Sequence, residues 1–132
     1  MDYVFAKGNL HLSLAKMKWI VCFTPHANRG TWKLLSFWRP KHQHCFATRY
    51  DANLDAWIYV ECSSHRFHFD LRTDDQATEL INYLMTECEC IQIEVEPKPV
   101  YHPRWLYCVS FVKHLIGIRG FFILSPYQLR CE

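Results

Sequence analysis

One amphipathic stretch near the end of the chain constrains the possible folds most strongly. Its apolar side chains recur at helical spacing: Val109, Phe111, Val112, Leu115 and Ile116. Gly117 follows as a C-terminal stop, so we expect a helix over residues 107–116. A helix with one apolar stripe must bury that stripe against another element, and the β-rich runs upstream supply the surface.

Cys108 falls in the first turn of this expected helix. Free backbone N–H groups and the positive end of the helix dipole stabilise a thiolate at that position. A cysteine placed there can act as a nucleophile if a histidine reaches it from elsewhere in the fold. The alternative is a small buried apolar residue, because free cysteines are among the most buried residue types.

The rest of the chain alternates β-rich runs with helical patterns. The β-rich runs cover residues 18–24, 44–50, 56–62, 66–72 and 90–96. One helical pattern spans residues 28–38, and another follows a capping box formed by Thr73 and Gln76. This second helix should end near Thr86, with one apolar face made of Ala77, Leu80, Ile81 and Leu84. The apolar tail, residues 121–129, should pack back as a strand or a short turn.

The element order β-α-β-β-β-α-β-α predicts an α+β domain with a mostly antiparallel sheet and helices packed on it. A length of 132 residues fits one domain. Residues 1–16 are weakly patterned, so we interpret them as an N-terminal extension and 17–132 as the single domain. Met17 is an alternative start for the mature chain.

Charge, hydropathy and cysteine content limit the kinds of partner that the protein can bind and indicate the cellular compartment in which it works. The net charge is +2 with both signs interspersed, which gives no electrostatic argument for nucleic acid. No apolar run approaches the ~18 residues of a membrane span, and the N-terminus does not resemble a secretory signal. The seven cysteines are therefore expected as reduced thiols in a cytoplasmic protein.

His44 is the histidine best placed to act as the base for Cys108. It begins a β-rich run, and folding the next hairpin about Asn53 brings it opposite Glu61 or Cys62. A carboxylate there could hold the imidazole, as the chemistry of a thiol nucleophile requires. The alternatives are a surface or core histidine and a solvated acid.

These segments together resemble a group of small papain-like proteins from phages and proteobacteria. The resemblance is carried by residues 44–50, 57–61, 108–118 and 125–129. The group is similar to the circularly permuted NlpC/P60 superfamily, in which the histidine strand precedes the cysteine helix. That superfamily includes the lecithin–retinol acyltransferase-like enzymes, whose motif Asn-Cys-Glu-His-Phe-Val is similar to Tyr-Cys-Val-Ser-Phe-Val at residues 107–112.

The resemblance implies a permuted papain-like fold and a cysteine-dependent hydrolase or acyltransferase of the peptidase or amidase kind. Cys108 matches the nucleophile, His44 the base and Glu61 the third polar position. A ring nitrogen of His44 should then lie within about 4 Å of the Cys108 sulfur. The substrate would be a peptide or acyl compound, with no cofactor. Tyr107 replaces the asparagine and no Glu-His follows Cys108, so the acyltransferase substrate does not carry over.

Two other interpretations remain open at this point. Zinc is one, because six residues of ligand type gather around the same hairpin: His42, His44, Cys45, Cys62, His65 and His68. Their spacing matches no common zinc motif. A catalytically inactive interaction domain on the same scaffold is the other.

Overall fold

The computed structural model describes residues 16–25, 42–62, 66–96, 108–118, 120 and 122–131. The helix expected over residues 28–38 and the N-terminal extension lie outside these ranges. Within them, the predicted α+β architecture with an antiparallel sheet is confirmed. No helix in the described ranges is long and apolar enough to cross a membrane.

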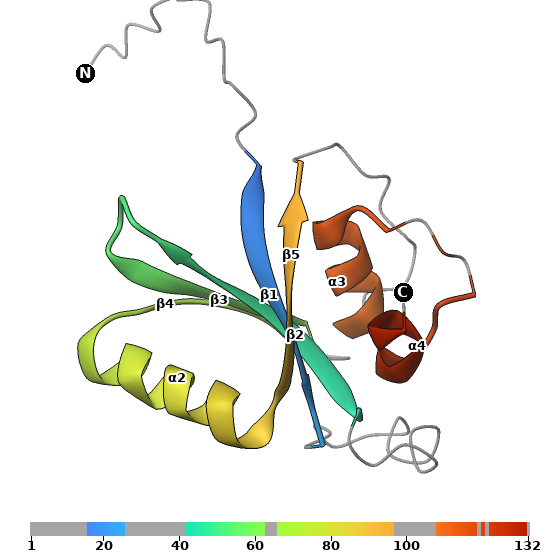
Figure 1. Ribbon diagram of the computed structural model, residues 1–132, viewed down its shortest axis with the longest axis horizontal. Coiled ribbons are helices and arrows are strands. Elements are labelled where there is room, and N and C mark those ends of the chain that lie inside the picture. Colours follow the sequence, from blue (N-terminus) through green and yellow to red (C-terminus); the bar gives the residue numbers. More distant parts are fainter. Residues whose placement is uncertain are drawn as a thin grey trace, which may run out of the picture.

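A five-stranded antiparallel sheet forms the centre of the fold (Figure 1). Its strands are β1 (Met17–Thr24), β2 (His44–Asp51), β3 (Ala56–Cys62), β4 (Phe67–Arg72) and β5 (Glu89–Val95). They lie in the order β4-β3-β2-β1-β5, so the first strand is internal and the last one lies at an edge. Each strand begins and ends within about one residue of the run that predicts it.

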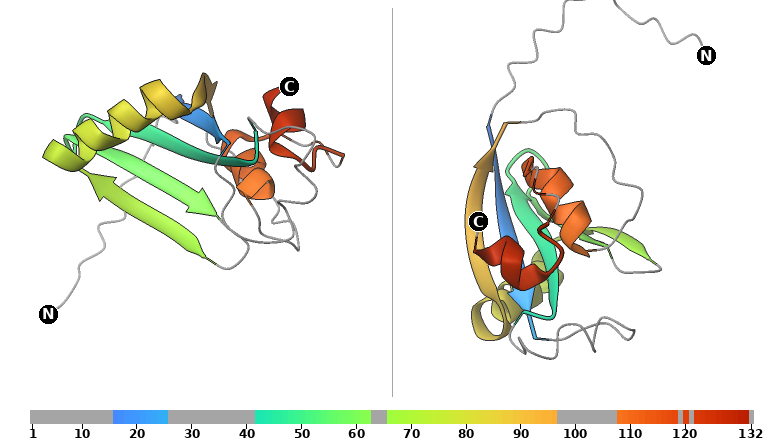
Figure 2. Two further views of the ribbon diagram at one scale, coloured as in Figure 1. Left: turned by 90° about the horizontal axis from the view of Figure 1, so that it is seen from below. Right: turned by 90° about the vertical axis from the view of Figure 1, so that its right-hand side faces the viewer.

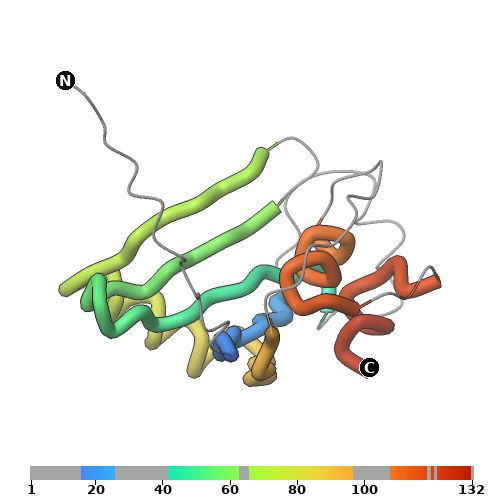
Figure 3. The backbone as a smooth tube through the Cα atoms, turned by 90° about the horizontal axis from the view of Figure 1, so that it is seen from above, coloured from blue at the N-terminus to red at the C-terminus, as the bar shows by residue number. Residues whose placement is uncertain are grey.

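The internal strands are apolar on both faces because helices cover the sheet from both sides. In β1, Val21 and Phe23 face one layer and Cys22 faces the other, and all three are at most 1% exposed. Figure 3 traces the strands in this order, with β4 at the edge away from β1. Two cores therefore flank one sheet.

Helix α2 (Asp74–Glu87) covers one face of the sheet (left panel of Figure 2). Leu80 and Leu84 pack there against a cluster of three sheet residues, Cys22, Phe46 and Tyr59. The predicted apolar face is wrong at Ile81, which is 41% exposed. Tyr83 packs against the cluster in its place, because the helix turns that neighbouring position toward the sheet.

The predicted capping box at the start of α2 is also wrong. Thr73 is the N-cap, but within residues 66–96 its side chain makes no capping hydrogen bond. Asp74 follows with a φ of 50°, in the left-handed region. This backbone departs from the geometry in which an N-cap hydroxyl reaches the third helical N–H.

Helices α3 (Cys108–Ile116) and α4 (Pro126–Arg130) lie on the opposite face (right panel of Figure 2). The α3 stripe is confirmed, since Val109 and Val112 are fully buried and Ile116 nearly so. Gly117 ends the helix with a φ of 77°, a conformation that favours glycine. The helix packs mainly across β2, which brings its first residue to the β2 side of the sheet.

The tail forms the short helix α4, where the sequence predicted a strand or a turn. Ser125 and Gln128 make a reciprocal capping box at its start, and Pro126 occupies the first helical position. The Ser125 Oγ accepts from the Gln128 backbone N–H at 3.2 Å, and the Gln128 Oε1 accepts from the Ser125 N–H at 3.0 Å. Leu129 then buries its side chain in the same core as α3.

Candidate active site

The hairpin of β2 and β3 brings His44 and Glu61 together. Nε2 of His44 lies 2.6 Å from Oε1 of Glu61. The expected register is wrong, because the turn at residues 52–55 pairs Ala47 with Val60. Continuing that register places Phe46 opposite Glu61, so His44 reaches the carboxylate on the diagonal.

The Glu61 carboxylate is held at its other oxygen as well. The Tyr59 hydroxyl donates to Oε2 of Glu61 at 2.9 Å. The Arg72 guanidinium carbon lies 4.4 Å from the centroid of the Tyr59 ring and packs over that ring. The hydrogen bond to His44 lowers the pKa of Glu61 more than partial burial raises it, so the carboxylate is charged at neutral pH.

Cys108, the first residue of α3, lies near Cys45 and His44, and both side chains influence its pKa. The hydrogen bond from Cys45 is the largest influence and lowers the pKa of Cys108, while burial raises it. The hydrogen bond and charge of His44 lower it further, to about 5. Cys108 is therefore a thiolate at neutral pH.

His44 is buried at the first position of β2 and carries the matching positive charge. Burial lowers its pKa, but the hydrogen bonds and negative charges of Cys108 and Glu61 outweigh that effect and raise it to about 9. At a pH between these two pKa values, Cys108 and His44 form a thiolate–imidazolium pair, and the Glu61 carboxylate lies next to the imidazolium. Three residues from distant parts of the chain thus share one charge network.

Two further thiols, those of Cys45 and Cys62, lie near the Cys108 sulfur. Cys45 and Cys62 are both buried, and burial is the main cause that raises the pKa of each. They therefore stay protonated, and Cys45 can donate its S–H to the Cys108 thiolate. Sequence reasoning considered Cys45 only as a zinc ligand. The available signal was strand alternation, which turns the residue next to His44 toward the α3 face.

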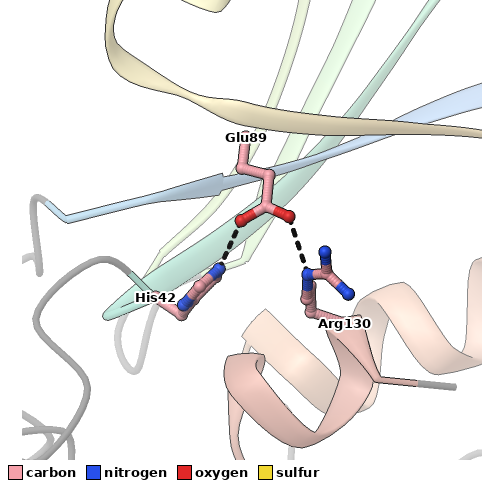
Figure 4. A network of polar contacts seen from close by, with 3 residues as sticks. All are labelled: His42, Glu89 and Arg130. Carbon is pink, nitrogen blue, oxygen red and sulfur yellow. Dashed lines mark hydrogen bonds and ion pairs between the residues drawn. The ribbon is translucent and has the colours of Figure 1, made fainter.

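The six residues of the zinc interpretation do not gather at one point. Nε2 of His42 lies 2.7 Å from Oε2 of Glu89, whose other oxygen lies 2.7 Å from Nε of Arg130 (Figure 4). The His68 ring contacts Tyr59 with centroids 5.9 Å apart, and His65 lies outside the described residues. Among the residues that the structure describes, no group of three or more His, Cys, Asp or Glu side chains could hold a metal ion.

Comparisons with known proteins give no family for this chain, so the inference of function rests on the candidate site. The chain matches no model of a protein family, and no curated protein or solved structure is significantly similar to it.

Proposed function

We propose that the protein is a cysteine-dependent hydrolase or acyltransferase that acts on an amide or ester carbonyl. The observation that carries this proposal is the position of His44, whose imidazole hydrogen-bonds to Glu61 and lies near enough to Cys108 for each to shift the pKa of the other. A nucleophile, a base and an orienting carboxylate in one chain of contacts are the parts that thiol acyl transfer needs. The substrate class follows the resemblance, a peptide or acyl compound.

Acylation begins with the Cys108 thiolate attacking the carbonyl carbon of the substrate. As the C–S bond forms, the carbonyl oxygen becomes an oxyanion, for which the backbone N–H of Cys108 at the helix start is a donor. Because Glu61 holds Nε2 of His44, Nδ1 is the nitrogen left to protonate the leaving amine or alcohol. The bond between the carbonyl carbon and this leaving group then breaks, which gives an acyl thioester, the free amine or alcohol and a neutral imidazole.

Deacylation reverses these roles. Neutral His44 removes a proton from water or from an acceptor nucleophile, which attacks the thioester carbon. The C–S bond breaks, and Cys108 leaves as the thiolate beside the restored imidazolium. Water makes the protein a hydrolase, and an amine or alcohol makes it an acyltransferase. Glu61 keeps the imidazole in one tautomer through both steps.

The arrangement of elements also supports a permuted papain-like assignment. The histidine strand β2 precedes the cysteine helix α3 in the chain, as it does in the permuted superfamily. The α3 helix packs across that strand with its N-terminal end at the histidine. The support is an order of elements combined with a contact between them, which a generic α+β fold does not require.

Competitive alkylation tests the proposal without knowledge of the substrate. With limiting iodoacetamide at pH 6, we expect Cys108 to be modified before the other six cysteines, which peptide mapping by mass spectrometry measures. Cys131 is the internal reference for the labelling rate, since it is an exposed thiol at the end of α4. Cys131→Ser is the matched control variant for Cys108→Ser. Labelling of Cys108 no faster than Cys131 would contradict the proposed nucleophile.

An activated ester tests the acylation step itself. With p-nitrophenyl acetate, we expect a burst of nitrophenolate and an acetyl group on Cys108, both lost in Cys108→Ala and retained in Cys131→Ser. A folded protein that shows preferential alkylation but no acetylation in excess of Cys108→Ala would be a reactive thiol without transferase chemistry. That result would favour the inactive interaction domain.

A further inference from the structure

A second pair of thiols lies on the other face of the sheet, away from Cys108. Cys22 of β1 and Cys90 of β5 are direct partners across the antiparallel pair, and their sulfur atoms lie 3.5 Å apart. We propose that these two residues form a reversible disulfide when the protein meets a hydroperoxide, with Cys90 as the oxidised thiol and Cys22 as the resolving one. The proposed hydrolase chemistry uses neither residue.

The strand register places the two backbones at a separation that a disulfide can span. Directly opposite residues in an antiparallel pair have Cα atoms about 4.5 or 5.5 Å apart, and both values fall within the usual disulfide range. Strands β1 and β5 run side by side along most of their length (Figure 1), with seven paired positions from Met17 to Phe23. The sulfur atoms must approach by about 1.5 Å to bond, a distance that side-chain rotation covers.

The two thiols differ in access and acidity, which sets the direction of the reaction. Cys90 is exposed at the edge strand, whereas Cys22 is fully buried in the α2 core. The Cys22 hydrogen bond is the main cause that lowers the pKa of Cys90, and the same contact raises the pKa of Cys22. Cys90 is therefore the thiolate that reaches solvent, and Cys22 is the buried, protonated partner beside it.

The chemistry balances with a hydroperoxide as the oxidant. The Cys90 thiolate attacks one peroxide oxygen, forming a sulfenic acid and releasing hydroxide when the oxidant is hydrogen peroxide. The Cys22 sulfur then attacks the sulfenic sulfur, forming the S–S bond and releasing water. The two sulfur atoms together give up two electrons, which reduce the peroxide. A dithiol reductant restores both thiols.

Cys88 is the competing partner for Cys90. It lies at the C-cap of α2, its charge raises the pKa of Cys22, and the charge of Cys90 raises its own pKa, so it is close to the pair. Cys88 and Cys90 are one residue apart in sequence, which is a poor geometry for a bridge. The strand register selects Cys22 instead.

The test oxidises the full chain with one equivalent of hydrogen peroxide and maps the cross-links by mass spectrometry without reduction. It uses the native protein and the Cys108→Ser variant, so that oxidation of the proposed nucleophile is separated from this reaction. We expect a mass loss of two hydrogen atoms and a linked pair of tryptic peptides, one carrying Cys22 and one carrying Cys90. Dithiothreitol should restore the original mass.

Two single variants decide which thiol is involved, since Cys88 and Cys90 share a tryptic peptide. Cys88→Ser should keep the full yield of cross-link, and Cys90→Ser should lose it while Cys22 stays reduced. Cys90 is exposed, so its serine variant should keep the fold, which circular dichroism checks. A cross-link that survives Cys90→Ser, or a Cys90 that proceeds to sulfinic acid with Cys22 unmodified, would overturn the proposal.

Discussion

His44 and Glu61 meet on the diagonal of the β2–β3 hairpin, with Nε2 of His44 2.6 Å from Oε1 of Glu61. The pair forms within one hairpin, whereas the thiol that completes the network comes from a helix that lies much later in the chain. The hairpin therefore sets the orientation and charge of the imidazole, and α3 delivers the sulfur. Variants of Glu61 and of Cys45 separate these two contributions.

Replacing Glu61 by glutamine should weaken His44 as a base, while the amide still fills the position of the carboxylate. Loss of the carboxylate lowers the pKa of His44 and, through the weaker imidazolium, raises that of Cys108. We expect acetylation by p-nitrophenyl acetate at neutral pH to fall about tenfold or more. Glu79→Gln on the exposed part of α2 is the control and should leave the rate unchanged. Equal rates in both variants would remove Glu61 from the proposed mechanism.

The pH dependence of acylation should be bell-shaped. The reactive form needs a deprotonated Cys108, whose pKa is about 5, and a protonated His44, whose pKa is about 9. The initial rate should rise as the pH passes the first value and fall as it passes the second. Stopped-flow release of nitrophenolate measures this profile. A rate that rises only near the ordinary thiol pKa of about 8.5 would contradict the thiolate–imidazolium pair.

Cys45 should act as a positioning residue for the nucleophile. Its hydrogen bond is the main cause that lowers the pKa of Cys108, so Cys45→Ala should raise that pKa and slow alkylation of Cys108 at pH 6. Cys45→Ser keeps a donor and should restore the faster rate. The alanine variant should also lose roughly 1 kcal/mol of unfolding free energy, because Cys45 is fully buried. If Cys45→Ser reacts as slowly as Cys45→Ala, the effect comes from packing and not from the hydrogen bond.

The stripe of α3 should contribute strongly to stability. Val112 is fully buried between the helix and the sheet, and Val112→Ala should cost about 2 kcal/mol of unfolding free energy. Met85 is 82% exposed on α2, and Met85→Ala should change the stability by less than about 0.5 kcal/mol. Urea unfolding at equilibrium measures both values. Similar losses in the two variants would show that α3 is not docked as described.

Local sequence patterns predicted most of the fold because each element carries its own signal. The β-rich runs alternate or stay continuously apolar according to their place in the sheet, and Gly117 ends α3 where its stripe ends. The helix α4 was missed although Ser125, Pro126 and Gln128 occupy typical cap positions. A segment of five residues is too short for periodicity to distinguish a helix from a turn.

The contacts of the candidate site were harder to predict than its members. Choosing His44 and Glu61 required only a strand and a hairpin, but their contact depends on where the turn at residues 52–55 sets the register. Cys45 and Tyr59 were not seen as supports, because their roles follow from which face of the sheet each side chain occupies. A single sequence does not fix that choice for a strand that is buried on both faces.

The place of β1 between β2 and β5 has a consequence for the order of events during synthesis. Strands β1 to β4 are neighbours in sequence and in the sheet, so they can assemble before the rest of the chain leaves the ribosome. Strand β5 must then cross the sheet to pair with β1, and only after it does α3 follow. Until that helix docks, Cys108 has no partner at β2 and titrates as an ordinary thiol. Incomplete chains therefore lack the acidic form of Cys108, and the reactivity of this thiol first exists once α3 has docked on β2.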